Sequence, residues 1–383
     1  MRKKFIYVIA SHECPGIHRT GGIGTYSRAA YHHLRKNGIN AILITGLGLR
    51  LGVRHLIVPY NKLGRRIFGG IVHDIAFKIL LSAIIFRLLR INNVIVEIPE
   101  YNNDVILIEI LKWITSKMAW SSNKLITHVR CHASVGLVRK NQTIGGQIGI
   151  RRELSLLLER ILVRCADVRS APTEHYSALC KLFYGKDIRS YPNFIDCIGS
   201  PGSGIRFEKY NDKRTLFFYG TITEEKGYFD LVSAFSLVRM NIPNIRLVVA
   251  GFRNPRIKSE PAVEYIGFVD RETISELNQI AIATIIPSHY ETFGMVLVEA
   301  INDGAVIIAS DIKPFREVAG DNSGVEFFIA RSTADLARAI SSVCNRRDNS
   351  ANRPRDGHKL VDAINHSAVE GLQNILTVLS QKL

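Results

Sequence analysis

The chain has 383 residues, of which 46% are hydrophobic and 22% are charged. This length exceeds one ordinary domain and suits two, and the composition is typical of a globular protein with buried cores. None of the six cysteines stands in a C-x-x-C pair, and no Asp-x-Asp motif occurs, so scattered thiols in a reducing cytosol are expected and a metal site is not.

The net charge of +16 is concentrated in the first half of the chain. Residues 1–195 hold 29 Lys and Arg against 11 Asp and Glu, a net charge of +18, whereas residues 196–383 hold 21 against 23. This asymmetry indicates an anionic membrane surface or an anionic acceptor as partner, and a solvated basic surface without a partner remains open. No aromatic and basic stripe or nucleic-acid-binding motif occurs, so nucleic acid is not expected.

Apolar runs of strand length alternate with helix-length segments along the chain. The first run, residues 5–10, is too short for a signal peptide and fits a buried strand. The runs lack polar alternation, as expected for parallel strands covered on both faces, and the helices between them indicate right-handed β-α-β units. The expected strands are residues 5–10, 39–45, 93–99, 124–131 and 167–172, then 215–220, 245–251, 263–268, 283–288, 305–310 and 325–330.

The strand and helix pattern runs twice, with a break rich in Gly, Pro and Ser at residues 191–207. We therefore expect two doubly wound, Rossmann-like α/β domains, residues 1–195 and residues 196–358. Residues 359–383 predict an amphipathic C-terminal helix that packs back toward the N-terminal domain.

Residues 67–91 are unusually apolar, but Asp74 and Lys78 interrupt the run, so it is not expected to span a membrane. One interpretation is a core helix of the first domain. The other adds an apolar edge on a membrane interface, beside nearby arginines. These arginines are Arg65, Arg66, Arg87 and Arg90.

Two glycine-containing turns follow predicted strands. Gly21 and Gly22 open a helix, where backbone N–H groups favour a phosphate, although a tight turn without a ligand remains open. In "FYGTITEEKGYF", Lys226 precedes a helix at the carboxyl end of a strand, where ligands of doubly wound sheets bind. Lys226 is either a charge placed on a phosphate or a solvated lysine at a helix start.

The stretch "HYETFGMVLVEA", residues 289–300, follows the strand "ATIIPS" and carries two carboxylates eight residues apart. Glu291 lies in the turn at the ligand end of the sheet, and Glu299 is expected to face inward from an apolar helix. A buried Glu could accept hydrogen bonds from two ribose hydroxyls, or it could cap or pair with a structural Arg. Phe293 and Gly294 would bring backbone N–H groups to the helix start.

In order and spacing, these motifs resemble the retaining glycosyltransferases of family 4, which have the GT-B fold. The motifs are "GGIGTY", "YPNFID", "YGTITEEKG", "VEYIGFVD" and "HYETFGMVLVEAINDGAVIIAS", and they cover nearly the whole chain. The resemblance implies an acceptor-binding first domain and a donor-binding second domain that face each other across a cleft.

The resemblance also implies a role for each matching residue. Glu291 would lie beside the donor sugar, Glu299 would hold the ribose, and Lys226 would neutralise the diphosphate. His132, with His128 as a poorer match, would contact the transferred sugar, so Glu291, Lys226 and His132 are the expected catalytic residues. The remaining donor-binding positions are Gly21, Gly22, Gly220, Thr221, Ile266, Gly267, Phe268, Phe293, Gly294 and Met295.

The chain departs from the family at Thr221, where Arg is usual. The missing positive charge could come from Arg19, Arg130 or Arg253, or donor binding could be weaker.

The function implied is retaining transfer of a sugar from a UDP- or GDP-linked donor to a hydroxyl of a glycan or lipid-linked acceptor. The expected setting is bacterial capsule, O-antigen or lipopolysaccharide synthesis, in the cytoplasm or at the inner face of the plasma membrane. No cofactor or metal is expected. The alternatives are another GT-B enzyme, such as a nucleotide-sugar epimerase or a phosphorylase, and a catalytically inactive membrane-surface scaffold.

Overall fold

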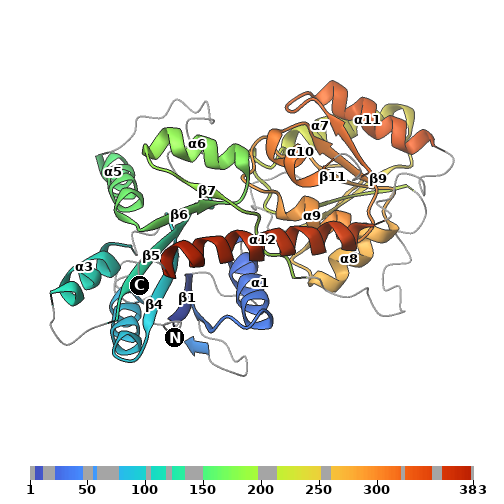
Figure 1. Cartoon of the computed structure of the whole chain (residues 1–383). Coiled ribbons are helices and arrows are strands. Elements are labelled where there is room, and N and C mark those ends of the chain that lie inside the picture. Colours follow the sequence, from blue (N-terminus) through green and yellow to red (C-terminus); the bar gives the residue numbers. More distant parts are fainter. Residues whose placement is uncertain are drawn as a thin grey trace. The chain divides into compact units, whose positions relative to one another are not determined.

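The computed structural model describes residues 5–11, 22–45, 55–57, 77–100, 105–117, 123–133, 150–196, 214–251, 260–320, 324–346 and 356–380. The chain divides into two compact units (Figure 1). The first contains Met1–Asp196 and Ile364–Leu383, and the second contains Cys197–Ala363. Each unit is built around one parallel sheet.

The first unit has a seven-stranded parallel sheet in the order β3-β2-β1-β4-β5-β6-β7. The order reverses between β1 and β4, the position at which doubly wound sheets bind ligands. Five strands were predicted, whereas β3 and β7 were missed because runs of three and two residues carry no periodic signal. The bounds are β1 (Phe5–Ser11), β2 (Ala41–Thr45), β3 (His55–Ile57), β4 (Asn93–Pro99), β5 (Leu125–Arg130), β6 (Val168–Ala171) and β7 (Arg189–Ser190).

Helices cover both faces of this sheet. On one face, α1 (Gly22–Lys36) packs in a core with the last part of α12 (Gly357–Ser380), where Tyr26 and Leu34 join Leu372 and Ile375. Right-handed crossovers from β3 through β6 place the helix over residues 77–89, α3 (Val105–Ser116) and α5 (Ile150–Cys165) on the other face. Figure 1 shows α3 and α5 across the sheet from α1. The last crossover helix is α6 (Glu174–Tyr184).

The second unit has a six-stranded parallel sheet in the order β10-β9-β8-β11-β12-β13, and all six strands were predicted. Its order reverses between β8 and β11. The strands are β8 (Thr215–Tyr219), β9 (Arg246–Ala250), β10 (Val263–Gly267), β11 (Ala283–Ile286), β12 (Ile307–Ser310) and β13 (Val325–Phe328). The helices are α7 (Tyr228–Asn241), α8 (Arg271–Ile280), α9 (Met295–Asn302), α10 (Lys313–Ala319) and α11 (Thr333–Asn345).

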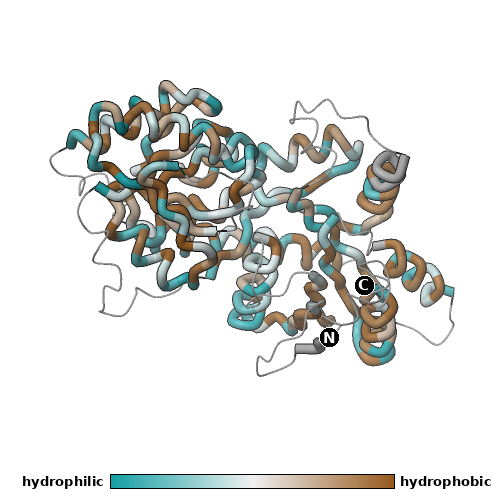
Figure 2. Tube along the Cα trace, turned by 180° about the vertical axis from the view of Figure 1, so that it is seen from behind, coloured by the Kyte–Doolittle hydropathy of each residue, from teal (hydrophilic) through white to brown (hydrophobic). Residues whose placement is uncertain are grey.

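The four inner strands of the second unit, β8, β9, β11 and β12, are buried on both faces, which explains their apolar runs, whereas the edge strands β10 and β13 are only partly buried. Leu216 and Phe218 of β8 pack into one core with residues of α7 and α11, whereas Phe217 and Tyr219 pack into another with Leu277 of α8. Successive side chains of a strand point to opposite faces, so both faces of β8 need apolar residues. Figure 2 shows the hydrophobic residues along these strands.

The C-terminal helix α12 begins in the second unit and continues, from Ile364, in the first. Gly357 lies so close to Ile301 that an added Cβ would be 2.1 Å from the Ile301 carbonyl oxygen. Further along, the Asn365 side-chain amide exchanges hydrogen bonds of 2.8 and 3.0 Å with the backbone of Ile195. No helix within the described ranges is both long enough and apolar enough to cross a membrane.

Candidate active site

The turn between β8 and α7 carries Lys226 and depends on a glycine. Gly227 caps the start of α7 with φ of +65°, in the left-handed region that favours glycine. A Cβ at this position would lie 1.8 Å from the carbonyl oxygen of Pro287. The turn therefore packs directly against the chain that leaves β11, because residue 227 has no side chain.

This close approach brings together Lys226 and Glu291, the two principal residues predicted in the second unit. The Lys226 Nζ lies 2.5 Å from the Glu291 Oε1, which also accepts a 3.0 Å hydrogen bond from the Ser288 hydroxyl. The side-chain exposures are 34% for Lys226 and 15% for Glu291, so both remain reachable from solvent. The pair stands after β8 and β11, at the point where the strand order reverses.

Two further hydrogen bonds join the same two segments. The backbone N–H of His289 donates to the Glu225 carbonyl at 2.8 Å, and the His289 Nε2 lies 2.6 Å from the Asp230 Oδ2. The side-chain exposures are 8% for His289 and 29% for Asp230, so the contact is only partly shielded from water. Sequence reasoning missed this pair because Asp230 lies on α7, 59 residues away.

The start of α9 has the backbone arrangement predicted for "FG". Gly294 caps the helix with φ of +97°, and an added Cβ would lie 2.5 Å from the Phe315 ring. Phe293 is buried in the core, and Met295 is half-buried. Because no side chain caps this end, its N–H dipoles suit an anionic group.

Glu299 is half-buried on α9 and does not lie in the apolar core. Burial alone would lower the pKa of the neighbouring Arg271, but the negative charge of Glu299 and hydrogen bonds to Asp303 raise it overall. The Arg271 guanidinium binds both carboxylate oxygens of Asp303 at 2.8 and 2.9 Å. The expected alternative of a structural Arg beside Glu299 is thus present, and its direct hydrogen-bonding partner is Asp303.

The remaining predicted donor-binding positions lie at the ends of β8 and β10, beside Gly251 at the end of β9. Gly251 donates to the Gly267 carbonyl at 2.7 Å and approaches Gly220 so closely that an added Cβ would be 1.9 Å from its carbonyl oxygen. Thr221 is exposed and supplies no charge, and the Phe268 ring is 53% exposed. Ile266 is half-buried beside them.

In the first unit, a buried carboxylate holds the loop that carries His132. Glu100 follows β4 and accepts hydrogen bonds from the backbone N–H of His132, at 2.9 and 3.0 Å, and of Ala133, at 2.6 Å. Burial raises the pKa of Glu100 to about 7, although these N–H groups lower it. The His132 ring is buried and meets the Tyr26 ring edge-on at 4.8 Å. Gly22 is the first residue of α1, and Gly21 lies outside the described residues.

A buried polar network crosses β1, β4 and β5, and sequence reasoning missed it. The Glu97 carboxylate accepts hydrogen bonds from Tyr7 at 2.5 Å and Tyr26 at 2.9 Å. Burial raises the pKa of Glu97, while the charge of Arg130 and these bonds lower it. The one available signal was Glu97 itself, a charged residue in the apolar run "NVIVEIP".

Two residues considered from the sequence lie in this network: Arg130, as a replacement for the charge absent at Thr221, and His128, as a poorer match for the sugar contact. Arg130 is fully buried and donates to Ser170 Oγ, to Asn193 Oδ1 and to backbone carbonyls, so it is not available to replace the charge absent at Thr221. His128 is also fully buried in β5, and burial lowers its pKa to about 3. It is therefore a neutral core histidine. The other proposed replacements, Arg19 and Arg253, lie outside the described residues.

Comparison with known proteins finds similarities that fall mainly in the second unit. Residues 205–359 match the family Glycosyl transferases group 1. The glycogen synthase of Mycobacterium tuberculosis is 31% identical over 140 residues, covering 33% of this chain and 33% of the relative. The phosphatidyl-myo-inositol mannosyltransferase of the same organism is 30% identical over 146 residues, covering 36% and 38%. The matches thus span little more than a third of these relatives' lengths.

A solved structure establishes the fold of the whole chain. The Anabaena protein HepE in complex with UDP-glucose aligns with a TM-score of 0.68 at 13% identity, over 98% of this chain and 99% of that one. Identity this low supports the fold alone, and it confirms the predicted GT-B fold. The chain therefore has the GT-B fold, and residues 205–359 resemble the family Glycosyl transferases group 1.

Proposed function

We propose that the protein is a retaining glycosyltransferase that moves a sugar from a UDP- or GDP-linked donor to a hydroxyl of a glycan or lipid-linked acceptor. The ion pair between Lys226 and Glu291 carries the proposal, because it places one cation and one carboxylate at the strand ends of a glycosyl transferases group 1 domain. The relatives support it: one is named a glycogen synthase and another a phosphatidyl-myo-inositol mannosyltransferase, and the HepE structure is a complex with UDP-glucose.

Each residue has a distinct part in the proposed reaction. As the donor bond breaks, negative charge builds on the diphosphate, and the Lys226 ammonium and the N-terminus of α9 would stabilise it electrostatically. Glu291 would exchange its bond to Lys226 for hydrogen bonds from hydroxyls of the donor sugar. Glu299 would accept from the ribose, and His132 would contact the transferred sugar. No metal is required by these roles.

The proposed setting is the synthesis of a bacterial cell-surface polysaccharide at an anionic membrane. The net charge of +18 in residues 1–195 supports this setting, as does the lipid named in one relative.

The test is acceptor-dependent release of nucleotide from labelled UDP- and GDP-sugars. Glu291→Ala should lower turnover at least a hundredfold, because it removes a group proposed to bind the reacting sugar. Glu272→Ala, which removes an exposed carboxylate from α8, is the matched control and should leave turnover unchanged. Wild-type turnover in Glu291→Ala would reject the site assignment, and release that never needs an acceptor would reject the transferase proposal.

A further inference from the structure

Exposed apolar side chains are concentrated on one helical layer of the first unit. Of the fourteen large hydrophobic residues that are exposed in the described part of the chain, nine lie between residues 79 and 182. The helix over residues 77–89, α3 and α5 carry most of them, and these helices cover the same face of the sheet. Helices α3 and α5 also contact each other.

The centre of this layer is α3, which is apolar on both sides. Ile108 is fully buried against the sheet, whereas Ile110, Trp113 and Ile114 are 47%, 66% and 41% exposed. Residues three and four apart share a helix face, so these three form one outward stripe. Leu157 and Ile161 of α5 are 55% and 46% exposed at the same spacing. A contiguous stripe of this kind on a surface helix indicates a binding surface.

The exposed charges described on this outer surface are positive. Among the side chains described in the three helices and in the residue after each, the exposed charged ones are Arg87, Arg90, Lys117, Arg160 and Arg164, and none of those described and exposed is acidic.

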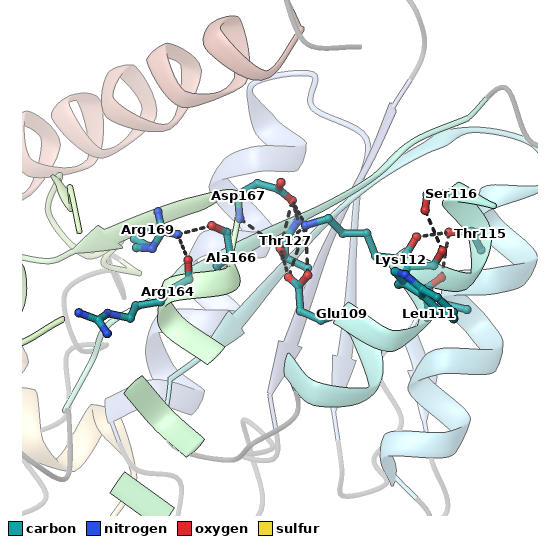
Figure 3. A network of polar contacts seen from close by, with 11 residues as sticks. Glu109, Leu111, Lys112, Thr115, Ser116, Thr127, Arg164, Ala166, Asp167 and Arg169 are labelled. Atoms are coloured by element: carbon teal, nitrogen blue, oxygen red, sulfur yellow. Dashed lines mark hydrogen bonds and ion pairs between the residues drawn. The ribbon is translucent and has the colours of Figure 1, made fainter. Parts of the chain in front are cut away.

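Two nearby carboxylates are only partly exposed and share one lysine. Lys112 Nζ lies 2.6 Å from Asp167 Oδ2 and 3.2 Å from Glu109 Oε2 (Figure 3). The Thr127 hydroxyl donates to Glu109 at 2.5 Å. The surface is therefore apolar and basic.

We infer that the outer face of α3, α5 and the helix over residues 77–89 docks on an anionic lipid bilayer. Apolar side chains with an aromatic ring at their centre enter the boundary between headgroups and acyl chains, while the surrounding arginines meet anionic headgroups. A second copy of the chain fits less well, because a two-fold interface would set this basic surface against itself. The inference deepens the proposed function, since it identifies the surface that would bring the active site to a lipid-linked acceptor.

Lipid binding can be measured without donor or acceptor, so its outcome is independent of the proposed transfer activity. The second tryptophan of the chain is Trp120, so Trp120→Phe leaves Trp113 as the single fluorophore. Vesicles that contain phosphatidylglycerol should shift Trp113 emission to the blue at low salt, and brominated acyl chains should quench it. Pure phosphatidylcholine vesicles should do neither.

Variants locate the surface by co-sedimentation with the same vesicles. Trp113→Ser should weaken binding about tenfold, since it removes a large apolar contact. Arg87→Gln with Arg90→Gln should weaken it roughly 25-fold, at about fivefold for each arginine. Met240→Ser in the second unit removes another exposed apolar residue, 73% exposed, and should have no effect. The inference is overturned if anionic vesicles do not bind, if Trp113→Ser binds like Met240→Ser, or if light scattering shows a dimer that Trp113→Ser dissociates.

Discussion

Replacing Gly227 by alanine tests how the site is assembled. The backbone at residue 227 is left-handed, which costs an alanine about 1–2 kcal/mol. The added Cβ would also meet the Pro287 carbonyl oxygen at 1.8 Å, whereas real Cβ contacts begin near 3.0 Å. The turn must therefore move by about 1.2 Å away from β11, and Lys226 must move with it.

The chain offers a matched control at Gly304. This glycine belongs to the same unit, has φ of +73° against +65° at Gly227, and has no atom within 4 Å of an added Cβ. Gly304→Ala should therefore lose only the unfolding free energy that an alanine costs in a left-handed backbone, without the steric contact. The free energy of unfolding of Gly227→Ala should be lower than that of Gly304→Ala, by about 1–3 kcal/mol for the overpacked contact.

Activity should separate the two variants further. A displacement of about 1 Å at a reacting centre can cost about a hundredfold in rate, so Gly227→Ala should lose about that factor in turnover at saturating donor. Gly304→Ala should retain most of its turnover. Urea unfolding and nucleotide release measure the two effects. The reasoning fails if both variants unfold at the same urea concentration and turn over alike.

Two further predictions concern buried carboxylates. Glu100 has its pKa raised from 4.5 to about 7, so the folded state binds this proton more tightly than the unfolded state, and stability is lost as pH rises from 4.5 to 7. Relative to Glu100→Gln, which cannot ionise, the wild type should lose about 3 kcal/mol of unfolding free energy between pH 4 and pH 8, and parallel pH profiles would contradict this. Asp303→Ala should cost about 3–5 kcal/mol, because it leaves the Arg271 guanidinium, only 17% exposed, without its bidentate partner. Asp356→Ala, in an exposed pair, is the control, and equal losses in the two variants would refute the argument.

The sequence was most informative where local pattern and function coincide. In the second unit, each buried strand is a continuous apolar run, and the residues of the site follow a strand directly. The turn of Lys226 and the turn of Glu291 could therefore be placed at the same edge of the sheet before any coordinates were known. The tight packing of Gly227 on Pro287, which makes them meet, depends on atoms 60 residues apart in sequence and had no local signal.

The first unit was harder to predict for a related reason. Its polar residues act through contacts across strands: Tyr7 bonds to Glu97, 90 residues away, and Arg130 bonds to Asn193, 63 residues away. Periodicity shows which residues lie on one face of a strand but not which pair they form. Arg130 therefore looked like a cation available to a donor, although its hydrogen bonds are already made inside the unit.

The burial of Arg130 changes how charge is distributed in the proposed site. Thr221 is exposed and uncharged, and Arg130 is buried in the core. Among the predicted donor-binding residues in the described part of the chain, the one with a positive charge is therefore Lys226. The remaining stabilisation of a diphosphate would come from backbone N–H groups, which act only at close range. Gly294 allows such an approach at α9, where a side chain would collide with Phe315. The proposed enzyme therefore relies on the exact packing of its glycine turns to a greater extent than one with two cationic side chains on the diphosphate.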